Sequence, residues 1–268
     1  MDDVLRDEKN QSSSSTFDIP FDVIDLPSRG KLYKGTSLDG MESLEIHYLT
    51  AKEEDILTSP NLIQSGKLLD VLLGSVLKNK KINPEDFLLG DRNTILVWLR
   101  NTGYGEEYPI PVQCSHCDHE FVNTFDLSNL DIKELEIDPD EDGLFTCVLP
   151  VRKNTIRFTL LTAGDEKKIQ RKIEDTKKIT RTPVNPASTF RMRFAIKEVD
   201  GNSDPTFIAK YVDTMPVKDS RAFRMKFSDI EPGTVMKQEM TCPECGERGD
   251  EHIPIRSNFF WPDSESQE

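Results

Sequence analysis

Two Cys-x-x-Cys pairs hold the side chains that are best suited to chemistry in this chain. We name them the first knuckle, Cys114–Cys117, and the second knuckle, Cys242–Cys245. The two-residue spacing lets two thiolates and nearby backbone amides wrap one metal ion, and four thiolates complete a tetrahedral structural zinc site. The sequence therefore predicts one structural Zn²⁺, bound by Cys114, Cys117, Cys242 and Cys245.

Other interpretations of the cysteines stay open at the level of the sequence. The knuckles are separated by 124 residues, far more than in a simple zinc ribbon, and could be two turns without metal or disulfides formed in air. A thioredoxin-like redox site is disfavoured, because neither pair opens an evident helix after a strand. Three histidines lie near the cysteines and could replace a ligand: His116, His119 and His252.

A longer pattern precedes each knuckle and recurs along the chain. Three residue pairs share one spacing of 128 positions: Asp91 and Asp219, Gly105 and Gly233, and Cys114 and Cys242. Farther upstream, residues 49–54 (Leu-Thr-Ala-Lys-Glu-Glu) resemble residues 161–166 (Leu-Thr-Ala-Gly-Asp-Glu). We interpret this recurrence as an internal duplication. Two copies packed about a pseudo-twofold axis would bring the knuckles together, so that each copy supplies half of the zinc site.

Helix starts recur in the two copies. Strands are expected at 44–48 and 155–160, and the threonine that follows each strand, Thr50 or Thr162, fits a helix N-cap. Glu53 completes a capping box with Thr50, because its carboxylate can accept the N-cap amide. Asp165 holds the matching position in the second copy, but its shorter side chain reaches back less far.

These elements predict an α+β fold made of two internally duplicated strand-helix-strand units joined by a zinc-ribbon-like four-cysteine site. Apolar spacing and the match between copies predict further helices at 68–77, 87–99, 188–199 and 221–227. Strands are expected to flank the knuckles at 108–112, 121–125, 235–240 and 252–255. The predicted domains are a disordered leader (1–17), a first repeat (18–138), a second repeat (139–262) and an acidic tail (263–268).

Charge and hydropathy exclude several classes of protein. The formal net charge is −14, so the mean field repels polyanions such as DNA or RNA. The richest cationic run, 167–181, also contains acidic residues and is expected to be a solvated helix face. No stretch approaches about 20 apolar residues, so no membrane span is predicted. The first residues lack the features of a signal peptide, and we expect the protein to fold in a reducing cytoplasm.

Several residues with chemical potential are assigned structural roles. Asp91–Arg92 could suggest a catalytic pair, but its recurrence as Asp219 and Arg221 favours a carboxylate at the positive end of a helix, or an ion pair within the fold. Cys147 lies in an apolar strand and is expected to be a small buried side chain. No phosphate-binding glycine loop, GxSxG or HExxH motif is present in the sequence.

Two segments leave a choice between structure and binding. The carboxylates at 134–142 could hold a cation but lack the EF-hand spacing, which favours a solvated linker. The aromatic cluster at 259–262 (Phe-Phe-Trp-Pro) either seals the core beside the second knuckle or forms a docking plug for a partner, and we favour the core.

Four segments of the first copy resemble the T4-type phage baseplate family, whose members are baseplate hub subunits or hub-assembly proteins. They are the runs at 26–33 and 49–57, the stretch from Gly90 to Gly105, and the first knuckle. The resemblance covers most of residues 20–125, and the second half supports it through the duplication alone. The family has no established catalytic residues to carry over. The resemblance implies a role in building or forming the tail baseplate of a contractile-tailed phage.

We therefore expect a non-enzymatic structural or assembly protein of the baseplate hub or wedge region, acting through contacts with other tail proteins. It would work in the host cytoplasm during assembly and could remain in the virion baseplate. No membrane contact or small-molecule substrate is expected, and nucleic acid is disfavoured. The alternative is a zinc-ribbon nucleic-acid-binding or transcription-related factor. A metal-dependent enzyme is a third hypothesis, but it needs an open coordination position that four cysteines would close.

Overall fold

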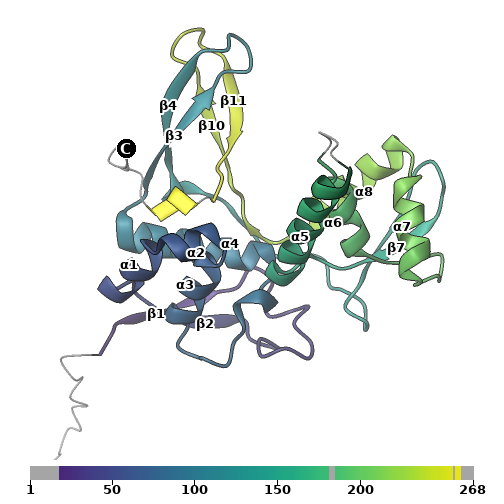
Figure 1. The fold of residues 1–268 in the computed structure, drawn as a ribbon, viewed down its shortest axis with the longest axis horizontal. Coiled ribbons are helices and arrows are strands. Elements are labelled where there is room, and N and C mark those ends of the chain that lie inside the picture. The colour runs from purple at the N-terminus through teal and green to yellow at the C-terminus, as the bar shows by residue number, and fades with distance from the viewer. Residues whose placement is uncertain (1–17, 181–184, 256, 261–268) are drawn as a thin grey trace, which may run out of the picture.

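The computed structural model describes residues 18–180, 185–255 and 257–260, over which helices alternate with small antiparallel sheets (Figure 1). The first half of the chain contains β1 (Phe21–Asp25), β2 (Ser43–His47), α1 (Ala51–Leu57), α2 (Pro60–Gln64), α3 (Leu68–Val76), η1 (Pro84–Asp86), α4 (Leu89–Tyr104), β3 (Glu107–Gln113), β4 (Glu120–Asp126), η2 (Leu127–Asn129) and β5 (Ile132–Lys133). The α+β class predicted from the sequence is confirmed.

The second half repeats the alternation of strands and helices. It contains β6 (Phe145–Val148), β7 (Thr155–Phe158), α5 (Ala163–Thr180), α6 (Ala187–Ala195), β8 (Ile196–Val199), α7 (Pro205–Asp213), α8 (Val217–Ile230), β9 (Gly233–Thr234), β10 (Lys237–Thr241), β11 (Arg248–His252) and η3 (Ser257–Phe260). Strands β6, β7 and β8 form one antiparallel sheet in that order. The predicted leader and acidic tail lie outside the described residues.

The helix caps follow the sequence prediction. The Thr50 hydroxyl accepts the Lys52 amide, and the Glu53 carboxylate accepts the Thr50 amide at 3.1 Å, so a capping box starts α1. At α5 the Thr162 hydroxyl accepts the Asp165 amide at 3.1 Å, but the return bond to the Asp165 carboxylate is long, at 3.5 Å. The shorter side chain therefore gives the weaker box, as expected.

Two predicted elements are wrong. The helix expected over 188–199 ends at Ala195, and Ile196–Val199 forms β8, because the buried Ile196 and Val199 complete the sheet beside β7. The strand expected over 252–255 lies earlier, as the polar β11. Its position is set by the turn of the second knuckle, which fixes the hairpin register, and not by apolar alternation.

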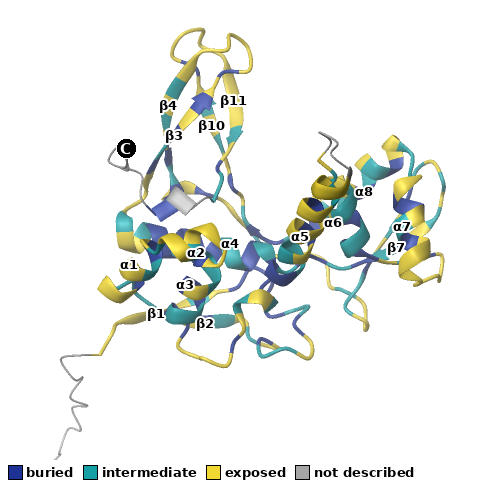
Figure 2. Cartoon of the chain, in the orientation of Figure 1, coloured by how far each residue is buried: buried dark blue, intermediate teal, exposed yellow. Residues whose placement is uncertain are grey.

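The two halves are packed together by close backbone contact. A Cβ added to Gly90, at the start of α4, would lie 1.7 Å from the Pro232 carbonyl oxygen, and one added to Gly233 would lie 2.5 Å from the Gly90 Cα. Only glycine allows this approach. Beside it, β5 of the first half pairs with β9 of the second, and Thr94 on α4 hydrogen-bonds Thr234. Buried residues concentrate where these elements meet (Figure 2).

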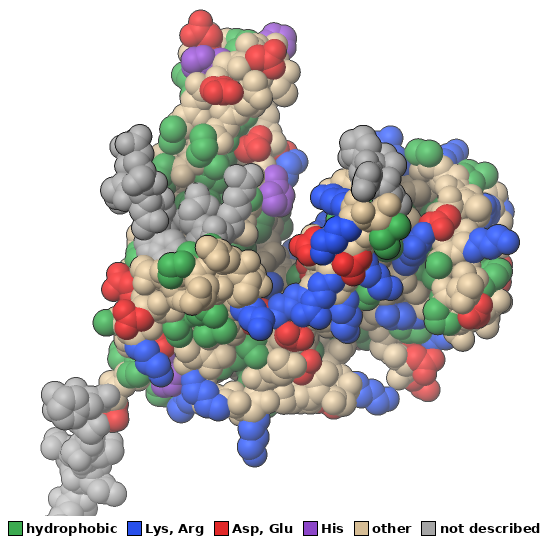
Figure 3. Space-filling view, viewed as in Figure 1, with side chains coloured by type: hydrophobic (Ala, Val, Ile, Leu, Met, Phe, Trp, Pro, Cys, Tyr) green, Lys and Arg blue, Asp and Glu red, His purple; other side chains and the backbone are tan. Residues whose placement is uncertain are grey.

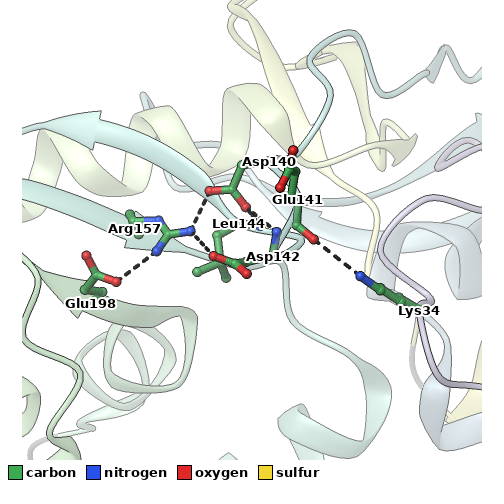
Figure 4. Close-up of polar contacts among 7 residues, drawn as sticks. All are labelled: Lys34, Asp140, Glu141, Asp142, Leu144, Arg157 and Glu198. Carbon is green, nitrogen blue, oxygen red and sulfur yellow. Dashed lines mark hydrogen bonds and ion pairs between the residues drawn. The ribbon is translucent and has the colours of Figure 1, made fainter.

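The acidic segment at 134–142 is exposed, as the linker prediction requires, yet it is tied to both halves. The Nη2 atom of Arg157 donates to Asp140 at 2.8 Å and to Asp142 at 2.7 Å, and its Nη1 atom donates to Glu198 (Figure 4). On the other side, cations of the first half contact the same segment, in the pairs Arg29–Glu134 and Lys31–Asp138. Basic side chains therefore neutralise much of this segment.

Among the described helices, none combines the length and the apolar character needed to cross a membrane.

Candidate metal centre

The two knuckles lie at the ends of two antiparallel hairpins that stand side by side (Figure 1). In the first hairpin, β3 and β4 pair up to Gln113 opposite Glu120. In the second, β10 and β11 pair up to Thr241 opposite Arg248. These closing pairs keep the 128-residue spacing seen for the cysteines, so both turns connect their strands in the same register.

The backbone of the two turns also matches. The Cys114 amide donates to the His119 carbonyl, and the Asp118 amide returns to the Cys114 carbonyl, both at 2.9 Å. The second turn repeats these bonds with the Cys242 amide and the Gly246 amide, again at 2.9 Å. Asp118 and Gly246 both have a positive φ, 58° and 74° respectively. Glycine tolerates this conformation best, and aspartate is one of the few other residues that adopt it. Each knuckle therefore presents its two thiols in the same way.

The four predicted cysteines converge on one point. Their sulfur atoms all lie within 4.8 Å of one another, with 3.7 Å between Cys114 and Cys245 and 3.7 Å between Cys117 and Cys242. Tetrahedral zinc with bonds of about 2.3 Å requires sulfurs about 3.8 Å apart. The same separations exceed an S–S bond, and all five cysteines are free. The donor set and its spacing fit a closed, four-thiolate zinc site.

The cluster contains no histidine. His116, His119 and His252 are absent from the group of potential ligands, and His119 instead stacks on Phe121 with ring centroids 5.9 Å apart. Cys114 and Cys242 are buried, whereas Cys117 and Cys245 face solvent. Two of the four sulfur-bearing side chains are therefore shielded from solvent by the hairpins, and the other two are accessible to solvent at the tip.

The thiols influence one another's ionisation. The amides of Cys117 and His116 donate to Cys114 and lower the pKa of its thiol to about 6. For Cys117 the His119 amide acts in the same direction, but desolvation and the neighbouring thiols outweigh it and raise the pKa to about 12. Closely spaced thiolates repel one another, so full ionisation of the cluster requires a bound cation.

Asp91 is fully buried near the start of α4 and has a structural role. Its carboxylate accepts the Ser28 amide at 2.9 Å, the Ser28 hydroxyl at 2.5 Å and the Tyr33 hydroxyl at 2.6 Å. Tyr33 in turn accepts the Leu88 amide. Burial raises the pKa of Asp91 in spite of these donors. The carboxylate thus fixes the Pro27–Arg29 turn to the first turn of α4.

Asp219 makes the corresponding contact in the second half. It is fully buried near the start of α8, and its carboxylate accepts the amides of Val151 and Arg152 at 2.7 and 3.1 Å. A Leu-Pro-x-Arg turn is therefore fixed to a helix start in both halves. Arg92 does not pair with Asp91 but lies 3.3 Å from Asp70. These burials and partners favour the structural interpretation over a catalytic pair.

Replacing Asp91 by alanine should lower the free energy of unfolding by about 3 kcal/mol or more. The change leaves the Ser28 amide and two hydroxyls buried without their acceptor, and each such group costs about 1–3 kcal/mol. Denaturant unfolding of the purified chain measures the loss. Asp175→Ala, at an exposed position of α5, is the control and should change stability by less than about 0.5 kcal/mol. Equal effects of the two substitutions would contradict the assigned role.

Arg100 is a structural residue that sequence reasoning missed. It is fully buried, and its guanidinium donates to the carbonyls of Phe259 at 2.9 Å, Glu107 at 2.8 Å and Gly105. It thereby joins the end of α4, the start of β3 and the C-terminal η3. In the sequence it is one cation in an amphipathic helix, and no local signal distinguishes it from a solvated arginine.

The aromatic cluster belongs to the core over its described part. Phe259 and Phe260 are both 0% exposed, and Phe259 packs edge-on against Tyr108 with centroids 5.1 Å apart. Trp261 lies outside the described residues. Cys147 is half-buried, so its predicted burial is only partly right, and desolvation raises the pKa of its thiol to about 11.

A groove of about 1010 Å³ lies between β10–β11 and the helices α6 and α8, on the hollowed face seen in Figure 3. Its lining mixes apolar side chains with both signs of charge. Arg191 is already paired with Glu166 at 2.7 Å, and Glu231 lies nearby with its pKa raised by burial. Among the described residues that line it, no serine hydroxyl is hydrogen-bonded to His252.

A protein-family model covers nearly all of this architecture. The model described as T4 bacteriophage base plate protein matches residues 21–261, which includes both hairpins and both buried aspartates. The chain belongs to the T4 bacteriophage base plate protein family. Comparison with curated proteins and with solved structures found no match. Family membership confirms the resemblance seen in the sequence and suggests a structural role in the virion baseplate, with tail proteins as partners.

Proposed function

We propose that the protein is a non-enzymatic structural or assembly component of the hub or wedge region of a contractile-tailed phage baseplate. The observation that carries this proposal is the family match over residues 21–261. The internal structure agrees with it, since the two buried aspartates hold turns and the converging cysteines form a closed donor set. The protein would act through contacts with other tail proteins, in the host cytoplasm during assembly and in the baseplate afterwards.

We further propose that Cys114, Cys117, Cys242 and Cys245 hold one structural Zn²⁺. The sulfur spacing supports this, as does the matching backbone of the two knuckles. When bound, zinc supplies coordinate bonds that contribute directly to the folding free energy. Because two ligands come from each hairpin, the metal would lock the hairpins to each other and present them as one rigid arm.

The chain is also proposed to be an internal duplication, with repeats at 18–138 and 139–262. Three structural correspondences at one 128-residue spacing support it: the closing pairs of the hairpins, the positive-φ residues Asp118 and Gly246, and the buried Asp91 and Asp219. An experimental structure tests the idea. Residues 44–125 should superpose on 156–255 with these positions aligned, and their placement in unrelated elements would argue against common descent.

Phage that lack this protein should accumulate baseplate precursors or heads without tails. A missing structural component stops assembly at the step that requires it, and electron microscopy of infected-cell lysates shows the stalled product. Plasmid-borne expression of the same chain should restore tails. Normal tails in its absence would contradict a role in the baseplate. Salt-dependent DNA binding by the purified chain would instead favour the zinc-ribbon nucleic-acid factor.

A further inference from the structure

Strand β1 has an open edge. It pairs with β2 on one side, from Phe21 opposite His47 to Asp25 opposite Ser43. The bonds that flank this ladder run from Tyr48 to the Pro20 carbonyl and from Leu26 to the Glu42 carbonyl. Even-numbered residues of β1 therefore bond towards β2. The backbone groups of odd-numbered residues 19–25 point the other way, where no described residue pairs with them.

Three of these four odd-numbered positions carry exposed apolar side chains, and the fourth is Asp25. Ile19 is 45% exposed, Phe21 41% and Val23 59%, and Figure 2 shows β1 as one of the exposed strands. Alternation puts these three side chains on one face of the sheet. An open edge and an apolar row thus occur together on β1 and the residues just before it.

Two other sheet edges, those of β3 and β11, are protected. Strand β3 carries Pro109 and Pro111, which lack the amide that edge-to-edge pairing needs. Strand β11 reads Arg-Gly-Asp-Glu-His and is charged along its length. Prolines and charges are the usual protection of edge strands. Strand β1 carries two carboxylates, Asp25 at its end and Asp22, which lies on the opposite face from Phe21 and Val23 and accepts the Tyr48 hydroxyl at 2.7 Å.

We propose that β1 accepts an extended segment of a neighbouring tail protein as a third strand of the β1–β2 sheet. The segment alternates apolar and basic residues. Its apolar side chains cover Ile19, Phe21 and Val23, while its basic side chains lie beside Asp22 on the other face, one strand spacing away. This inference rests on the proposed baseplate function and names the surface through which part of it is performed.

Charge favours a basic segment of another protein over two other possible occupants of the edge, a second copy of this chain and residues 1–17. A second copy paired antiparallel through β1 with Asp22 opposite Asp22 would bring the two carboxylates together, and like charges on neighbouring strands destabilise a sheet. Residues 1–17 of the chain hold four carboxylates, Asp2, Asp3, Asp7 and Glu8, against two cations. A basic segment from another protein would instead face the Asp22 carboxylate, on a chain of net charge −14 whose nearest cation at this strand is Lys78, over the Phe21 ring.

The substitution Val23→Pro tests the edge selectively. The Val23 amide points away from β2, so proline removes a bond that only an added strand could make and leaves the β1–β2 ladder intact. Val148→Pro is a matched control. Val148 is an exposed valine (63%) on the edge strand β6, and its amide also points outward, because Leu149 makes the ladder bond to Asn154.

The experiment uses phage carrying each variant, beside phage that lack the protein. We expect Val23→Pro to reduce assembled tails at least about tenfold, corresponding to 1.4 kcal/mol of lost binding, while Val148→Pro assembles normally. The two purified chains should melt at the same temperature. Normal tails with Val23→Pro would overturn the inference. The proposed function would still stand if the deletion phage fail to assemble tails. Normal tails in the deletion phage would remove the function itself.

Amide hydrogen exchange on the unmodified protein gives a second readout that needs no variant. The amides of Phe21, Val23 and Asp25 should exchange rapidly in the isolated chain and at least about tenfold more slowly in purified baseplates. Equal exchange in the two states would overturn the inference. Slow exchange in the isolated chain would mean that another segment already pairs with the β1 edge. That segment is residues 1–17 if deleting them restores rapid exchange, and a second copy if the exchange rate depends on protein concentration. Either result excludes the neighbouring tail protein.

Discussion

Replacing Cys242 by serine should remove the metal from both knuckles and loosen both hairpins. The wild-type chain, purified under reducing conditions, should contain one zinc per molecule by elemental analysis, and the variant close to none. Four-ligand zinc sites hold small domains with roughly 10–16 kcal/mol of apparent binding free energy, so losing one ligand costs a large part of that stabilisation. The effect should be concentrated at the hairpins, because the apolar core elsewhere does not depend on the metal.

The informative readout lies in the hairpin that was not changed. Cys114 is 131 residues from Cys245, yet their sulfurs lie 3.7 Å apart. Amides of β3 and β4 should therefore lose protection against hydrogen exchange when Cys242 is replaced. Cys147→Ser is the matched control, since Cys147 lies outside the cluster and should retain both the zinc and the protection. Two zinc ions per chain, or none in the wild type, would contradict the shared site.

The cysteine cluster was predictable because short spacings constrain chemistry directly. Two residues between cysteines define a knuckle, and the common 128-residue spacing indicated that distant knuckles should meet. The buried aspartates were found through the same spacing, although the sequence did not indicate what they hold. Their partners, Ser28 and the Val151–Arg152 backbone, are joined to them only by the tertiary fold.

Other features lacked a local signal. Residues 196–199 extend an amphipathic helix pattern, but they form a strand because they pair with β7 on the side that β6 does not occupy. Tertiary packing overrides helix propensity there. The polar β11 has no strand periodicity and forms because the second knuckle aligns it with β10. Arg100 is satisfied by carbonyls from three separate elements, a set that no sequence window contains.

Replacing Phe259 by alanine should lower the free energy of unfolding by about 3–5 kcal/mol, the usual cost of deleting a buried aromatic side chain. Phe259 is 0% exposed and lies between the rings of Tyr108 and Phe260, at centroid distances of 5.1 and 5.4 Å. The cavity would open beneath the strand that leads to the first knuckle. It would also disturb the segment whose carbonyl accepts from Arg100. Denaturant unfolding monitored by circular dichroism measures the change.

Phe207→Ala is the matched control for this prediction. Phe207 is 41% exposed on α7 and stacks on Tyr211 at 6.2 Å, so its removal creates no enclosed cavity and should cost less than about 1 kcal/mol. A docking plug would behave in the opposite way, with Phe259→Ala leaving stability unchanged and abolishing binding to tail proteins. Because Phe259 bonds through its backbone to a buried arginine that also reaches β3, we expect instability to come first and any assembly defect to follow from it.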